Sequence, residues 1–468
     1  MNPFNLLIQN KKAVAAMALL VMSVCSISCK KAIDVGNPKT EISSDAAFAN
    51  IGGATSAMLG IYASLEGYRD VNTTTLPGLS ADELTSYSTP LSRYYTNSLS
   101  SSVNDDFWSK YYNCIYQANS LIIKVNASKG IGDADKRKLI AEATFLRAFF
   151  HFYLINYFGD IPYITGIDYH ENSVVKRMSA KNVIYPLIIK DLLYAQANLP
   201  EDYPSADRVR ANKAVASAML ARVYLYYGDV VKAEKEATAV IENPNYSLET
   251  DINLVFLRES QESILQLSPN VNTLPNAVEG VTYILDDLPA NTRAKVSISD
   301  FLYNSFEPDD LRKTDWIGTF SNDGVKEFHY AFKYKSDGTV PGVEYSVVLR
   351  LAEQYLIRAE AKAEQNRVDE AVDDLAVIRE RAGLRPLAHA MSKAECLAAI
   401  QQERRVELFV EWGHRWLDLK RTGNVDKVMP AVCQAKGGVW NTDWQLYPIP
   451  KVQLNADPNM TGNQNHGY

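Results

Sequence analysis

Apolar side chains recur at intervals of three and four residues through most of this chain, which is the period of an amphipathic helix. The spacing predicts four helices in the first half, at 45–65, 105–125, 135–158 and 180–198. Gly159 and Pro162 follow the third helix and predict its end. Ser179 stands where an N-cap is expected for the fourth helix, and Pro200 follows that helix. The first half is therefore expected to be helical.

Two stretches resemble each other and predict a repeated helical pair. Residues 221–233 read ARVYLYYGDVVKA and residues 359–371 read AEAKAEQNRVDEA. In each, a helix breaks at a short polar turn, Gly228-Asp229 or Asn366-Arg367, and a second helix follows with Ala233 or Ala371 in register. Small residues at such positions let paired helices approach closely, as in tetratricopeptide repeats.

Between residues 251 and 345 the helical period is lost. Residues 262–268 (ESILQLS) and 328–334 (FHYAFKY) are expected to be strands, with turns at Asp323-Gly324 and Asp337-Gly338. The fold class predicted is mainly α, with tetratricopeptide-like helical pairs and an irregular, partly β insertion that carries binding loops. We expect a single domain at 45–468, made of a helical scaffold (45–250), the irregular region (251–345) and C-terminal helices with a tail (346–468).

The N-terminus has the features of a lipoprotein export signal. Lys11 and Lys12 precede an apolar stretch at 13–24, and small residues at 26–28 lead to Cys29. The stretch is shorter than the roughly 20 apolar residues of a spanning helix. We predict a signal peptide at 1–28, lipid on Cys29 and a tether at 29–44. The alternative is ordinary cleavage that leaves Cys29 free, and Cys25 is a poorer candidate because Val24 precedes it.

Charge and cysteine content narrow the possible functions. The net charge is −7, and removal of residues 1–28 leaves 46 basic and 55 acidic residues, or −9. An acidic chain without a basic block is a poor nucleic-acid binder. Cys114, Cys396 and Cys433 are an odd number without framework spacing, so we expect buried thiols rather than a disulfide scaffold.

One segment could suggest catalysis. Glu403, Glu407 and Glu411 recur every four residues, and paired carboxylates are what glycoside hydrolysis requires. Because Arg404, Arg405 and Arg415 are nearby, we predict instead a structural network of ion pairs on one helix. His414 is expected to be packed and hydrogen-bonded. We recognise no catalytic, nucleotide-binding or metal-binding motif, so we predict no enzyme activity, no cofactor and no metal site.

The aromatic residues are the best candidates for ligand contacts. The 27 tyrosines are about twice the average share. Several of them lie in two irregular, polar regions without a helical period, at 79–106 and 251–345. An aromatic ring with nearby polar groups suits a sugar, which presents apolar C–H faces and hydroxyl edges. The alternative is that these rings pack loops onto the scaffold. The candidate ligand-binding residues are Asp82, Tyr87, Arg93, Tyr94, Tyr95, Tyr283 and Trp316. Tyr303 lies in the same region as Tyr283 and Trp316, at 251–345.

Three blocks resemble a known family. They are 141–162 (AEATFLRAFFHFYLINYFGDIP), 349–363 (LRLAEQYLIRAEAKA) continuing to 378–384, and 403–423 (ERRVELFVEWGHRWLDLKRTG), with LYPIP at 446–450. Together with Cys29 and the closing Gly467-Tyr468, they resemble the SusD/RagB family of outer-membrane lipoproteins. The tail departs from the family pattern, because His466 stands where a proline is usual.

The resemblance implies a function. Members of this family are lipid-anchored at the cell outer membrane, are not enzymes, and bind a glycan that they deliver to a SusC-like TonB-dependent transporter. A peptide ligand, as in some members, is the first alternative. A tetratricopeptide adaptor that binds only protein is the second, and a surface glycosidase is a distant third.

Overall fold

The computed structural model describes residues 47–68, 72–102, 107–269, 274–338 and 342–468. Cys29, the signal peptide and the tether lie outside the described residues. From Phe48 onward the described chain forms one compact unit. Over half of it is helical, and the helices of the first half are α3 (Ile51–Tyr68), α4 (Asn72–Ser80), α5 (Ser92–Tyr95), α6 (Trp108–Ala127), α7 (Asp133–Phe158), α8 (Tyr169–Asn172), α9 (Tyr185–Asn198), α10 (Lys213–Tyr227) and α11 (Val230–Ile241).

The second half continues with short helices and then returns to long ones. The short helices are α12 (Val278–Tyr283), α13 (Asp300–Tyr303) and α14 (Leu311–Asp315). The later helices are α15 (Leu351–Glu364), α16 (Val368–Arg381), α17 (Lys393–Glu407), α18 (His414–Arg421), α19 (Val425–Ala435) and α20 (Lys451–Ala456). The predicted mainly helical fold class is confirmed.

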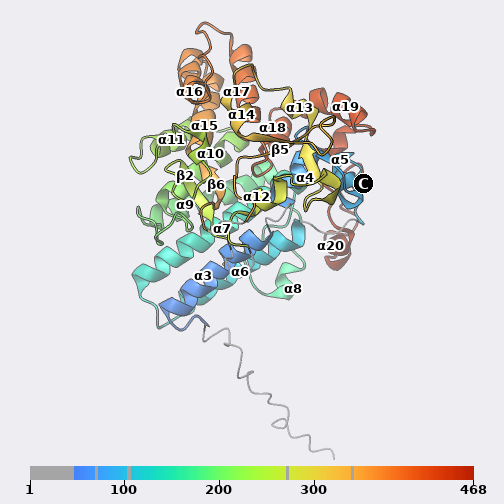
Figure 1. Cartoon of the computed structure of the whole chain (residues 1–468). Helices are drawn as coiled ribbons and strands as arrows, with labels where there is room; N and C mark the ends of the chain where they lie inside the picture. Colours follow the sequence, from blue (N-terminus) through green and yellow to red (C-terminus); the bar gives the residue numbers. More distant parts are fainter. Residues whose placement is uncertain (1–46, 69–71, 103–106, 270–273, 339–341) are drawn as a thin grey trace, which may run out of the picture. The chain divides into compact units, whose positions relative to one another are not determined.

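The repeated helical pairs are present where the sequence predicts them. Helix α10 packs against α11, α15 packs against α16, and α11 packs against α15, so the two pairs adjoin (Figure 1). Gly228 ends α10 with a φ of 94°, and Asp229 caps α11 by accepting a hydrogen bond from the Lys232 amide. Ala233 and Ala371 are fully buried, as close helix approach requires.

Helix α7 runs through the core and packs against α6 and α9. Its sequence from Ala141 onward is apolar on nearly every side, which is typical of a buried helix. Near its end, the Tyr157 ring stacks on Tyr447, with centroids 5.4 Å apart. The Asn465 side chain donates to the backbone oxygens of Phe158 and Tyr447 at 2.9 and 2.8 Å. The C-terminal segment therefore completes the core around α7.

The described strands form three antiparallel pairs. They are β1 (Leu84–Ser86) with β3 (Val296–Ile298), β2 (Ser263–Leu267) with β6 (Ser346–Arg350), and β4 (Ile317–Phe320) with β5 (Phe328–Ala331). The two predicted strands correspond to β2 and β5, although β5 is shorter than expected. Both predicted turns contain a glycine with positive φ, Gly324 at 71° and Gly338 at 94°. No described helix is long and apolar enough to cross a membrane.

Candidate functional site

The pairing of β1 with β3 joins the two irregular regions of the sequence. Leu84 lies opposite Ile298, and Ser86 lies opposite Val296. The pairing extends beyond the strands, because the Tyr87 amide donates to Lys295 at 2.8 Å and the Ser299 amide donates to Glu83 at 2.9 Å. Strand β3 also contacts β5. Loops that are about 200 residues apart in sequence therefore share one part of the structure.

Partly exposed aromatic side chains gather where these strands meet. We call this set the aromatic surface, and it consists of Tyr87, Tyr95, Tyr303, His329 and Tyr330. The Tyr303 ring stacks on the His329 ring, with centroids 3.6 Å apart and planes 6° apart. The Lys313 ammonium lies 4.1 Å from the centre of the Tyr303 ring. Tyr303 thus brings α13 together with β5 and α14.

Tyr87, which directly follows β1, and Tyr95 on α5 are held by neighbouring side chains. The Tyr87 hydroxyl lies 3.1 Å from the Ser297 hydroxyl, and its ring meets Phe328 edge to face. Burial raises the pKa of the Tyr95 phenol, and a hydrogen bond with Thr85 acts in the opposite sense. The Lys436 ammonium lies 4.9 Å from the centre of the Tyr95 ring. Both rings are oriented by contacts that leave part of each accessible.

Gly318 sets the position of Tyr330. The two residues are paired across β4 and β5, and the Tyr330 ring lies over the glycine. A Cβ atom at Gly318 would stand 2.2 Å from the Tyr330 ring, so any other residue would displace the ring. The glycine therefore allows a flat, half-exposed tyrosine on this hairpin.

Polar groups accompany the rings. Asp300 is exposed at the start of α13, and, apart from the effect of burial, its negative charge acts to raise the pKa of both Tyr95 and His329. Partial burial nevertheless lowers the pKa of His329 below its ordinary value, so the imidazole is neutral at neutral pH. Aromatic faces next to a carboxylate and an ammonium group can pack against the C–H face of a sugar and bind its hydroxyls.

Four of the predicted ligand residues are instead buried. Trp316 is 0% exposed, and its indole nitrogen donates to the Ile252 oxygen at 3.0 Å. The Tyr283 hydroxyl lies 2.6 Å from the Thr75 hydroxyl, and Tyr94 packs edge to face on Tyr447. These three rings pack loops onto the scaffold, which is the alternative that the sequence left open. They present no surface to a ligand.

Asp82, the fourth, is 2% exposed and lies between two arginines. It accepts hydrogen bonds from Arg415 at 2.8 and 2.9 Å and from Arg405 at 2.7 Å. Burial alone would raise its pKa, but Arg415 and Arg405 outweigh burial and hold the pKa well below its usual range. Its carboxylate is engaged inside the protein and does not reach the aromatic surface.

The remaining predictions fall on or beside the aromatic surface. Tyr87 and Tyr95 belong to it, and Arg93 lies on α5 with its guanidinium 5.4 Å from the centre of the Tyr94 ring. The sequence did not indicate Asp300, Lys313, His329 or Tyr330. The pattern of the predicted strand could have indicated His329 and Tyr330, because both lie between its buried residues Phe328 and Ala331.

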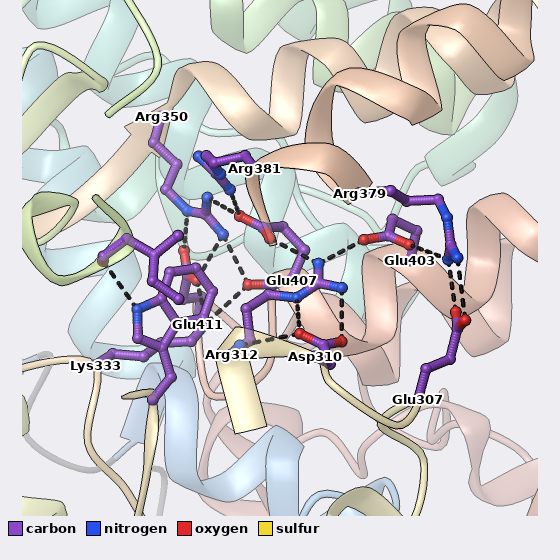
Figure 2. Close-up of polar contacts among 12 residues, drawn as sticks. Glu307, Asp310, Arg312, Lys333, Arg350, Arg379, Arg381, Glu403, Glu407 and Glu411 are labelled. Atoms are coloured by element: carbon purple, nitrogen blue, oxygen red, sulfur yellow. Dashed lines mark hydrogen bonds and ion pairs between the residues drawn. The ribbon is translucent and has the colours of Figure 1, made fainter. Parts of the chain in front are cut away.

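The carboxylates of the 403–411 segment form a buried ionic network (Figure 2). Arg350 binds Glu407 at 2.6 Å and Glu411 at 2.8 Å, and Arg312 binds Glu403 at 2.5 Å and Glu407 at 2.9 Å. Each of the three glutamates is buried, so none faces a space that could hold a sugar ring. The predicted structural role fits this geometry.

Two details of that prediction are wrong. Helix α17 ends at Glu407, so Glu411 lies in the turn that follows it. The cations that bind the glutamates come from other elements, whereas Arg404 pairs with Asp418, and Arg405 and Arg415 pair with Asp82. The network partners are Arg312, Lys333, Arg350, Arg379 and Arg381.

His414 and the three described cysteines are buried, and they do not form a reactive site. Burial lowers the pKa of His414 to about 4, so its imidazole is neutral at neutral pH. Cys114, Cys396 and Cys433 are buried free thiols, and burial raises the pKa of Cys114 to about 12. Within the described ranges, no group of three or more His, Cys, Asp or Glu residues is placed to hold a metal ion.

A cavity of about 980 Å³ lies between α15, α17 and α18, and it is the alternative to the aromatic surface as a binding site. Its wall includes Arg405, Arg415 and Arg421, which are already ion-paired with Asp82, Asp418 or Glu360. The aromatic surface combines accessible rings with the exposed Asp300, so we take the aromatic surface as the candidate site.

Comparisons with known proteins agree with this fold. A model described as the SusD family matches residues 312–468, and one described as starch-binding associating with outer membrane matches residues 35–225. SusD-like protein P2 of Formosa agariphila is 29% identical over 414 residues, which are 77% of this chain and 80% of that protein. Starch-binding protein SusD of Bacteroides thetaiotaomicron is 24% identical over 442 residues, covering 74% and 75%.

Solved structures of SusD superfamily and SusD-like proteins superpose on most of the chain and share its fold. A SusD superfamily protein from Bacteroides vulgatus has a TM-score of 0.79 at 19% identity and covers 90% of this chain and all of its own. A laminarin-binding SusD-like protein has a TM-score of 0.74 at 22% identity, with the same coverage. Two family models that match opposite ends of the chain, together with relatives that align over about three quarters of it, lead to one conclusion: the chain belongs to the SusD/RagB family.

Proposed function

We propose that this protein binds a glycan at the aromatic surface and passes it to a partner TonB-dependent outer-membrane transporter, without catalysing a reaction. The observation that carries the proposal is the stacked Tyr303–His329 pair beside the exposed Asp300. Rings fixed by protein contacts lose little conformational entropy when a sugar packs on them. Relatives named for binding starch and laminarin support a glycan as the ligand.

The anchoring belongs to the same proposal. Lipid on Cys29 would hold the protein at the outer membrane, with residues 29–44 linking the lipid to the folded part. The match to a family model described as associating with outer membrane supports this location. Pull-down of the tagged protein from outer membranes should recover a TonB-dependent transporter, and recovery without one would contradict the delivery step.

Binding is tested by electrophoresis through gels that contain laminarin, starch, xylan or galactomannan. We expect at least one polysaccharide to retard the wild type, and Tyr303→Ala to weaken that retardation about threefold to tenfold, because a stacked ring contributes roughly 0.5–1.5 kcal/mol. Tyr194→Ala is the matched control, since Tyr194 is a 40% exposed tyrosine on α9.

The control should migrate like the wild type. A wild type that none of these polysaccharides retards, and that binds nothing on a glycan array, would contradict glycan binding. Equal retardation of Tyr303→Ala and the wild type would remove the aromatic surface as the site.

A further inference from the structure

A groove lies between α6, α8 and α20, and its lining residues differ from those of the aromatic surface. Its volume is about 350 Å³, within the range of roughly 300–1,000 Å³ typical of small-ligand pockets. Helix α6 supplies one wall, α8 and the loop before it supply another, and α20 with the residues after it supplies the third. Nothing in the aromatic surface contributes to this lining.

Aromatic rings dominate the wall of the groove. Trp108, Tyr112 and Tyr116 are four residues apart, so they lie on one face of α6. The Trp108 and Tyr112 rings pack with centroids 5.0 Å apart, and the Tyr112 hydroxyl donates to the Pro162 oxygen at 2.7 Å. Tyr116 and Tyr169, which are 48% and 73% exposed, stand at the rim. Fixed rings at the base are thus combined with accessible rings at the opening.

The polar part of the lining is almost entirely uncharged. Carboxamides and hydroxyls line the groove, and Asp457 is the one charged residue among the described residues of its wall. The Asp457 carboxylate accepts from the Asn459 amide at 2.7 Å. Gln453 donates to the Ser109 hydroxyl at 3.0 Å, a bond that does not use its amide oxygen. The uncharged polar residues are Ser109, Asn113, Asn172, Ser173 and Gln453.

Contacts between distant segments hold the walls in place. The Asn459 side chain donates to the Val174 oxygen at 2.6 Å, which ties the segment after α20 to the loop after α8. Arg177 donates to the Asn463 oxygen at 2.5 Å and to the Asn465 side chain at 2.6 Å. A groove closed by such contacts needs little rearrangement to accept a ligand.

From this lining we infer that the groove is a second binding site for a neutral saccharide, an inference that rests on the proposed glycan binding. Tyrosine and tryptophan rings suit the apolar faces of a sugar, and amides suit its hydroxyls. None of the wall residues that the structure describes is cationic, which disfavours an anionic ligand. Two sites on one chain would let a long polysaccharide bind both at once, which raises its apparent affinity above that of either site.

The test compares variants at the two sites. Tyr116→Ala with Tyr169→Ala removes the rings at the rim of the groove, Tyr303→Ala removes a ring of the aromatic surface, and Tyr194→Ala is the control. Each is run through gels containing laminarin, starch, xylan or galactomannan, after circular dichroism confirms the fold. We expect the groove pair to weaken binding of the retarding polysaccharide about tenfold. Tyr169→Phe, which keeps the ring, should bind within about twofold of the wild type.

The outcomes separate the two proposals. If Tyr303→Ala weakens retardation and the groove pair migrates like the wild type, the second site is wrong and the proposed function stands. If the groove pair weakens retardation and Tyr303→Ala does not, the groove is the binding site and the aromatic surface is not. A wild type that no glycan retards overturns both.

Discussion

Asp82 and Arg415, which are 333 residues apart in the sequence, form a bidentate ion pair. Arg415 Nε and Nη2 lie 2.8 and 2.9 Å from the two carboxylate oxygens. The pair joins the segment just before β1 to the first turn of α18, and Arg405 on α17 also binds the Asp82 carboxylate. It therefore connects the parts of the chain that the two family models match separately.

Asp82→Asn should destabilise the protein strongly. The amide cannot balance two buried guanidinium groups, and an uncompensated buried charge costs about 3–5 kcal/mol. Chemical denaturation measures the change, and Asp202→Asn on the surface is the control. The glycan affinity of the folded protein should stay unchanged, because the carboxylate is buried. A stable variant that has lost affinity would return Asp82 to the ligand site.

Glu407→Ala should unfold the centre of the ionic network. Burial alone would raise the pKa of Glu407, but Arg381, Arg350 and Arg312 outweigh it and hold the pKa well below its ordinary range. Removing the carboxylate takes away a counter-ion that Arg312, Arg350 and Arg381 share, at a cost of about 3–5 kcal/mol in the free energy of unfolding. Glu370→Ala breaks only the exposed pair with Arg367 and should change the melting temperature little. Equal melting temperatures for both variants would contradict the structural role.

Glu83→Gln should change how stability depends on pH. Burial and the neighbouring Asp82 carboxylate raise the pKa of Glu83 to about 8, from an ordinary value of 4.5. Between these values the folded protein holds a proton that the unfolded chain has released, so this group lowers the free energy of unfolding as pH rises. The amide does not titrate and can still accept from the Val410 amide.

The free energy of unfolding of Glu83→Gln, relative to that of the wild type, should therefore increase by on the order of 3 kcal/mol as the pH rises from 5 to 9. Melting curves of the two proteins across this range measure the difference. The exposed Glu259→Gln provides a baseline. A difference that stays flat, or that shrinks toward high pH, would show that Glu83 is ionised in the folded protein.

Trp316→Ala and Tyr95→Ala should have opposite signatures. The Trp316 ring is packed against Phe256 and under the Lys333 ammonium, so its loss should cost about 3–5 kcal/mol of stability. Tyr95 is partly exposed, so its loss should weaken glycan binding about threefold to tenfold with a smaller change in stability. Calorimetric titration and thermal melting distinguish the two. Reduced affinity in a fully stable Trp316→Ala protein would place that ring at the ligand after all.

Cys29→Ala should prevent lipidation. Metabolic labelling with a palmitate analogue should mark the wild type and leave the variant unmarked, and the variant should leave the membrane fraction on lysis. Cys25→Ala is the matched control and should label like the wild type. Equal labelling of the Cys29 variant would show that the lipid is attached elsewhere.

The long helices could be predicted from the sequence because the spacing of apolar residues that defines each helix lies within that helix. The breaks at Gly228-Asp229 and Asn366-Arg367 lie at the observed turns, and helix ends differ by a few residues, such as a third helix that begins at Asp133 rather than 135. The short helices α12, α13 and α14 within the irregular region were not predicted. The sequence could not predict which irregular-region rings stay exposed, since Trp316 is covered by Phe256 and Phe409 from distant segments. The same reason explains the misassigned partners of Glu407, which come from α14, β6 and α16.

The contacts of Asn465 with Phe158 and Tyr447 have a consequence for the order in which the protein can form. Residue 465 lies about 300 residues after α7 in the sequence, so the centre of the molecule stays incomplete until this distant segment folds onto it. A chain cut before residue 465 would lose those contacts and the Arg177 bond to Asn465 together. Quality-control proteases would then meet a protein whose helices are present but whose middle remains open, so the loss of Asn465 would be as damaging as the loss of a residue in the core.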